Sequence, residues 1–139
     1  MDASYLQGLV GEWSERLARI SEQDSLKVVG SKWTRKQLLG HLIDSAANNY
    51  QRFVRLRQGD LVGFPGYDQE AWVAAGQYNQ CPWLDLVAFW RLYNLRIAAI
   101  IENLPPGCEG NVWEGHDASL GFLIQDFTRH MLHHLTRIS

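Results

Sequence analysis

The chain has 139 residues, of which 46% are hydrophobic and 20% charged, a composition typical of one globular domain with a sizeable core. Thirteen Lys and Arg residues and fifteen Asp and Glu residues give a formal net charge of −2. The chain therefore lacks the excess of positive charge that is typical of proteins that bind nucleic acid or anionic membranes. No apolar run reaches transmembrane length and no apolar leader follows Met1, which predicts a cytoplasmic protein. We expect a single domain covering residues 1–139.

The cysteine content is low and its spacing is uninformative about metal. Cys81 and Cys108 form neither a CxxC motif nor a zinc-ribbon pattern, so we expect free thiols in a reducing compartment. Aromatic residues are abundant, with six Trp and five Tyr, and such side chains fill cores and also line pockets or interfaces.

Two helices are predicted in the first half of the chain. Apolar residues recur at helical spacing through residues 3–22, at Leu6, Leu9, Val10, Trp13, Leu17 and Ile20. The stretch 23–33 is polar. Thr34 followed by Gln37 is a capping box that opens a second helix, which runs to about Leu56.

A long connection and a third helix follow. Residues 58–81 hold four glycines and are predicted to be a loop with one short helix, from Asp68 to Ala75. Pro82 suits the first position of a third long helix, which stops before Pro105.

The last predicted helix follows a loop over residues 105–118, with Ser119 as its N-cap, and extends to the C-terminus. No strand pair is predicted anywhere. Four long amphipathic helices indicate an all-α fold, a four-helix bundle with one short extra helix in the long connection between helices two and three.

Histidines gather near the end of the fourth predicted helix. His130 and His134 are four residues apart and so share one helical face, offset by about 40°. The apolar arc of this helix consists of Leu120, Leu123, Phe127, Met131, Leu135 and Ile138. His134 falls inside the arc, His130 lies at its edge and His133 falls outside it. An i,i+4 pair alone is a weak indication of metal, because a buried histidine also needs only a hydrogen-bonding partner.

A further histidine lies on the second predicted helix. His41 is at the border of that helix's apolar arc, where a histidine often simply faces solvent. Metal sites in bundles are built from inward side chains on facing helices. His41 with His130 and His134 would supply three neutral nitrogens from two helices.

Four segments of the chain carry motifs that can be compared with known families. The segment 33–46, WTRKQLLGHLIDSA, contains His41, and the closing run 130–138, HMLHHLTRI, contains a helical HxxxH motif. These two segments resemble the histidine motifs of the DinB/YfiT-like superfamily of four-helix-bundle metalloproteins. Between them, residues 67–73, YDQEAWV, and residues 90–94, WRLYN, resemble its weaker middle signatures. The order of the motifs matches over the whole chain.

This resemblance implies a metal site and a range of activities. The three metal ligands of the family carry over onto His41, His130 and His134, with His133 as an extra histidine that is not a ligand. The resemblance implies a divalent metal such as zinc or nickel, a small-molecule substrate and often a homodimer. Family members include enzymes that transfer low-molecular-weight thiols.

Three function classes stay open. The first is a metal-dependent enzyme that activates a low-molecular-weight thiol for S-transfer, because three neutral ligands leave an ion with open positions and a bound thiol would ionise. The second is a metal-assisted hydrolase that uses metal-bound hydroxide. The third is a non-catalytic helical interaction module.

Neighbouring side chains have candidate roles that the sequence does not decide. Asp126, Asp44 and Asn48 can orient the imidazoles or simply face solvent. An aromatic or amide group from Trp72, Trp90 or Asn94 can shape a pocket or belong to the core.

Overall fold

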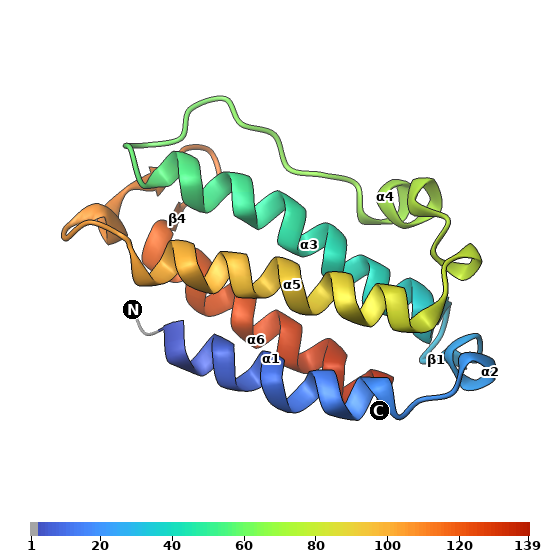
Figure 1. The fold of residues 1–139 in the computed structure, drawn as a ribbon. Helices are drawn as coiled ribbons and strands as arrows, with labels where there is room; N and C mark the ends of the chain where they lie inside the picture. Colours follow the sequence, from blue (N-terminus) through green and yellow to red (C-terminus); the bar gives the residue numbers. More distant parts are fainter. Residues whose placement is uncertain (1–2) are drawn as a thin grey trace.

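The computed structural model describes residues 3–139 and contains four long helices packed as a bundle (Figure 1). The long helices are α1 (Ala3–Ala18), α3 (Arg35–Leu56), α5 (Trp83–Glu102) and α6 (Leu120–Ile138). Two short helices, α2 (Glu22–Ser25) and α4 (Gln69–Gly76), and two 3-10 turns, η1 (Tyr78–Gln80) and η2 (Cys108–Gly110), lie in the connections. The predicted all-α four-helix bundle is confirmed, with its extra helix, α4, between the second and third long helices.

The packing order of the bundle differs from the chain order. α1 packs against α5, α5 against α3, α3 against α6, and α6 closes the ring against α1. In Figure 1, α1 and α6 run in one direction and α3 and α5 in the other. α3 therefore ends far from the point where α5 begins, and residues 57–82 must return along the bundle. The two histidine-bearing helices, α3 and α6, are neighbours.

Side-chain caps start the helices where the sequence predicts them. Thr34 and Gln37 form a complete capping box at α3, since each side chain bonds the other residue's backbone N–H. Asp68 caps α4, and Ser119 caps α6. Pro82 occupies the N-cap of α5 rather than its first helical position, a shift of one residue from the prediction.

The first helix is shorter than predicted, because a second cap interrupts it. α1 ends at Ala18 instead of continuing to residue 22. Ser21 is extended (φ −71°, ψ 157°), and its side chain accepts a hydrogen bond from the backbone N–H of Asp24 to start α2. A serine that bonds its local backbone in this way competes with helix continuation.

Two short antiparallel hairpins occupy segments that were predicted to be irregular. They are β1 (Val28–Val29) with β2 (Trp33–Thr34), and β3 (Val112–Trp113) with β4 (Ala118–Ser119). Gly30 and Gly115 supply the left-handed backbone of the two turns, at φ values of 74° and 85°. Each hairpin runs directly into an N-cap, that of α3 or that of α6. The hairpins therefore fix where the two histidine-bearing helices begin.

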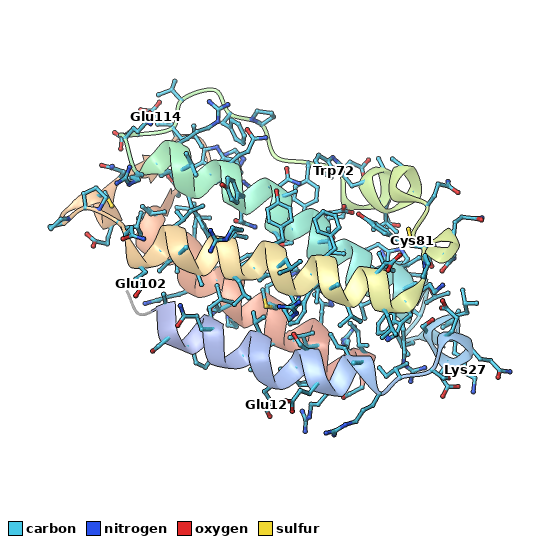
Figure 2. The ribbon with its side chains drawn as sticks, viewed as in Figure 1. Glu12, Lys27, Trp72, Cys81, Glu102 and Glu114 are labelled. Carbon is cyan, nitrogen blue, oxygen red and sulfur yellow. The ribbon has the colours of Figure 1, made fainter. Side chains whose placement is uncertain are left out.

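The core lies between the four long helices, and both cysteines lie in connections. The largest fully buried side chains include Trp83, Trp90, Phe53, Leu39, Ile97 and Met131. Cys81, in the turn before α5 (Figure 2), and Cys108 in η2 are free thiols. Within residues 3–139, no helix is both long and apolar enough to cross a membrane.

Candidate metal centre

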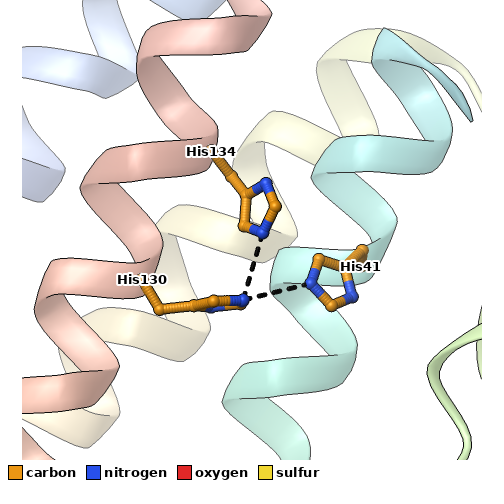
Figure 3. Close-up of side chains that lie close together, drawn as sticks. All are labelled: His41, His130 and His134. Carbon is orange, nitrogen blue, oxygen red and sulfur yellow. Dashed lines mark hydrogen bonds between the residues drawn. The ribbon is translucent and has the colours of Figure 1, made fainter. Parts of the chain in front are cut away.

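Three imidazoles from two helices converge at one point (Figure 3). His41 comes from α3, and His130 and His134 come from one face of α6. Nε2 of His130 lies 3.4 Å from Nε2 of His41 and 3.1 Å from Nε2 of His134. Each ring offers one ligand nitrogen within 4.8 Å of the other two. The structure thus brings together the three histidines that the sequence singles out.

Helix geometry and packing explain why these rings meet. The i,i+4 spacing places the rings of His130 and His134 one turn apart, with centroids 4.5 Å from each other. α3 lies against α6 and turns His41 inward, so that this residue is only 1% exposed. The indole of Trp33, from the strand that precedes α3, packs against His41, with the two ring centroids 5.0 Å apart.

The separations between the ring nitrogens suit a metal ion. Tetrahedral coordination at a zinc–nitrogen distance of about 2.0–2.1 Å places the ligand nitrogens roughly 3.3–3.4 Å apart. The observed separations of 3.4 and 3.1 Å are close to this spacing. Hydrogen bonds between neighbouring rings use the same nitrogens. The donor set is three neutral imidazoles, as in catalytic zinc sites that keep an open position.

Burial keeps the imidazoles neutral. Desolvation, assisted by the neighbouring His130, lowers the pKa of His41 to about 4. Desolvation and the other nearby histidines lower the pKa of His134 to about 3. The pKa of His130 is also lowered by burial, although Asp126 opposes that shift. Neutral rings keep the nitrogen lone pairs that a cation needs.

The predicted orienting residues have other partners. Asp126 pairs with Arg129, and the Asp44 carboxylate accepts a hydrogen bond from the hydroxyl of Tyr78. Nδ1 of His41 and Nδ1 of His134 have no hydrogen-bond partner among residues 3–139. Among residues 3–139, neither carboxylate forms a hydrogen bond to an imidazole of the cluster, so the structure gives no support to the orienting role that the sequence left open.

Asn48 and the two remaining histidines lie outside the cluster. The amide of Asn48 donates to the backbone carbonyl of Asp44 and does not orient a ring. His133 is exposed and is not part of the cluster, although its ring contacts that of His134 edge-on. His116 stacks on the indole of Trp113, at a centroid distance of 3.5 Å.

Two cavities flank the cluster. One, of about 300 Å³, has His130 in its wall and is also lined by Ser45, Asn49, Arg52, Tyr67, Trp113 and His116. The other, of about 160 Å³, has His134 in its wall together with Lys32, Trp33 and Arg137. Gln69, at the start of α4, borders both cavities. A small molecule in the larger cavity would lie beside the histidine cluster.

The sequence analysis did not identify the residues that line the larger cavity. Trp90 and Asn94, considered there as pocket residues, are fully buried in the core. Trp72, on α4 (Figure 2), packs its ring against Tyr67 and lines a separate pocket with Asp44 and Tyr78. Arg52 is the residue that a helical wheel could have revealed, since it is eleven residues after His41 and falls on the same face of α3.

The chain has a four-helix-bundle fold and a three-histidine cluster whose geometry suits a divalent metal. Among solved structures the chain is similar to YfiT from Bacillus subtilis, described as a probable metal-dependent hydrolase with an unusual four-helix bundle topology. The TM-score is 0.82 at 18% sequence identity, over 96% of this chain and 80% of that chain. At such identity the likeness establishes the fold alone. No protein-family model matches the chain, and no curated protein matches it.

Proposed function

We propose that this protein is a metal-dependent enzyme in which His41, His130 and His134 bind a divalent cation, zinc or nickel. The observation that carries the proposal is the convergence of three neutral ring nitrogens beside a cavity. Buried imidazoles with lowered pKa values stay unprotonated at neutral pH and are available as ligands. The fold of YfiT, a probable metal-dependent hydrolase, supports this assignment.

The first candidate reaction is S-transfer from a low-molecular-weight thiol to a small electrophile. A divalent ion with an open coordination position lowers the pKa of a thiol or water that it binds and so supplies a nucleophile at neutral pH. The protein contributes three ligands without charge, which leave the full charge of the ion to act on the nucleophile. The cavity of about 300 Å³ holds the second reactant next to His130.

The second candidate reaction is hydrolysis, with water as the nucleophile. The description of YfiT as a probable metal-dependent hydrolase favours it. The same ligands and the same cavity would serve both reactions. The two reactions differ in the nucleophile, which is a thiol in the first and water in the second.

An activity screen with matched controls tests the function. Untagged protein loaded with zinc or nickel is assayed with N-acetylcysteine or cysteine plus monobromobimane, and separately with p-nitrophenyl acetate. An S-transferase accelerates the first reaction only with thiol present, whereas a hydrolase accelerates the second without thiol. Either activity should disappear in metal-stripped protein and in His134→Ala. An activity that survives both changes would contradict the proposal.

We further propose that residues 1–139 act as one cytoplasmic domain that forms a homodimer. Its substrate is a small molecule, and its partners include neither nucleic acid nor a membrane. The net charge of −2 supports the absence of nucleic-acid binding. Apolar side chains exposed on α5, among them Phe89 and Leu92, support a second copy as partner.

A further inference from the structure

Arg52 is a buried cation without an anionic partner. The residue is 8% exposed, and within residues 3–139 no acidic group forms an ion pair with it. One terminal nitrogen lies 3.4 Å from the amide oxygen of Asn49, and Nε has no hydrogen-bond partner among the described residues. The guanidinium carbon lies 4.3 Å from the ring centroid of Trp113 and 5.7 Å from that of Tyr67. Most donors of this guanidinium therefore have no hydrogen-bond acceptor among residues 3–139.

The unused donors belong to a residue that lines the larger cavity. Arg52 and His130 both contribute to the wall of the 300 Å³ cavity. The carboxylate in that wall belongs to Asp126, which pairs with Arg129. A buried charge is costly unless it is paired, and desolvation already lowers the pKa of Arg52. An anionic group that enters the cavity would provide the missing partner.

An anion bound at Arg52 would lie at some distance from the three histidines along α3. Three helical turns lie between His41 and Arg52, which places their Cα atoms about 16 Å apart along the helix axis. Ser45 and Asn49 lie between them, on the wall of the same cavity. A molecule with an anion at Arg52 can therefore extend along α3 toward the histidine cluster.

We propose that Arg52 binds a carboxylate of the substrate and thereby selects small anionic molecules. A guanidinium recognises a planar carboxylate through two parallel hydrogen bonds. The aromatic rings of Trp113 and Tyr67 hold the guanidinium in place through cation–π contacts. The role of the bound molecule as a substrate rests on the proposed metal-dependent function, whereas the binding of an anion does not.

Binding of benzoate and benzamide tests this inference, because the two probes share size and shape and differ in charge. The indole N–H resonance of Trp113 reports binding, since this group lies in the cavity wall and donates to the carbonyl of Phe64. We expect wild-type protein to bind benzoate at least tenfold more tightly than benzamide. We expect Arg52→Gln to abolish that preference and Arg52→Lys to retain part of it. Arg55→Gln, which removes an exposed cation one turn away, should keep the full preference.

The metal-free protein separates this inference from the proposed function. In His134→Ala, and in wild-type protein treated with a chelator, the preference for benzoate should persist. An Arg52→Gln variant that keeps a tenfold preference, or a wild-type protein without one, would overturn the inference. A His134→Ala variant that loses the preference for benzoate, together with an Arg52→Gln variant that retains it, would place the anion at the histidine cluster. That result would also overturn the inference. Thermal unfolding of each variant verifies that the fold is intact.

Discussion

Asp44 is a buried residue on α3. Its carboxyl oxygen Oδ1 accepts a hydrogen bond from the hydroxyl of Tyr78, at an oxygen–oxygen distance of 2.5 Å. Burial raises the pKa of Asp44 above 3.8, and this effect outweighs the hydrogen bond, which lowers it. The native state therefore holds this proton more tightly than the unfolded chain. The resulting stabilisation is complete below pH 3.8 and is lost as the pH rises through the native pKa.

The exchange Asp44→Asn tests this pH dependence. The amide cannot ionise, so the free energy of unfolding of the variant should rise relative to wild type as the pH increases above about 4. Urea denaturation with a chelator present measures the difference between pH 3.5 and 7. Asp85→Asn, at an exposed position on α5, is the control. A difference that is independent of pH, or that falls with pH, would contradict the assignment.

The three histidines could be predicted from the sequence, but the anion-binding wall could not. His130 and His134 share a face by local helix spacing, and His41 lies in a motif that resembles a known family. The wall around Arg52 combines α3 with rings from two distant connections. Trp113 reaches it because its indole N–H donates to the carbonyl of Phe64, and helical periodicity contains no information about such a long-range contact.

At the scale of the elements, the connection between α4 and α5 is held on α3 by the ring of Tyr78. This ring packs between two glycines, and a Cβ atom added at Gly40 would lie 2.0 Å from Cδ2 of Tyr78. A Cβ atom added at Gly76 would lie 2.4 Å from Cε2 of the same ring. The absence of a side chain at both positions allows this close approach.

The substitution Gly40→Ala should therefore destabilise the protein by about 1–3 kcal/mol, despite the better helix propensity of alanine. Gly11→Ala on α1 is the matched control, because a Cβ atom at this position meets no atom within 4 Å. Alanine there should stabilise the helix by roughly 0.5–1 kcal/mol. Chemical denaturation measures both. Equal effects of the two substitutions would contradict the packing argument.

The long helices could be predicted because an apolar stripe repeated over many turns is a strong pattern. Two-residue strands are too short to show the alternation that identifies a strand. The second hairpin is also bonded to a distant segment. The backbone N–H of Leu61 donates to the carbonyl of Val112, and the backbone N–H of Glu114 donates to the carbonyl of Leu61. The hairpin that precedes α6 thus depends on the connection that follows α3.

At the scale of the whole molecule, we expect a homodimer. Phe89 and Leu92 on α5 are each 53% exposed, and the Phe89 ring stacks on that of Tyr93. Light scattering at micromolar concentration should give twice the 15.9 kDa mass of one chain. Leu92→Arg should shift the mass toward that of one chain, whereas Val62→Arg, at an exposed loop position, should not. A wild-type mass of one chain would contradict the expectation.

The metal content of two histidine variants tests the central claim most directly. Untagged wild-type protein, His134→Ala and His133→Ala are loaded with zinc, passed through gel filtration and analysed for metal per chain. We expect one ion per chain in wild type and in His133→Ala, because His133 is exposed and outside the cluster. We expect almost none in His134→Ala, because one of three ligands is lost. Equal loss in both variants, or no stoichiometric metal in the wild type, would contradict the three-histidine metal site.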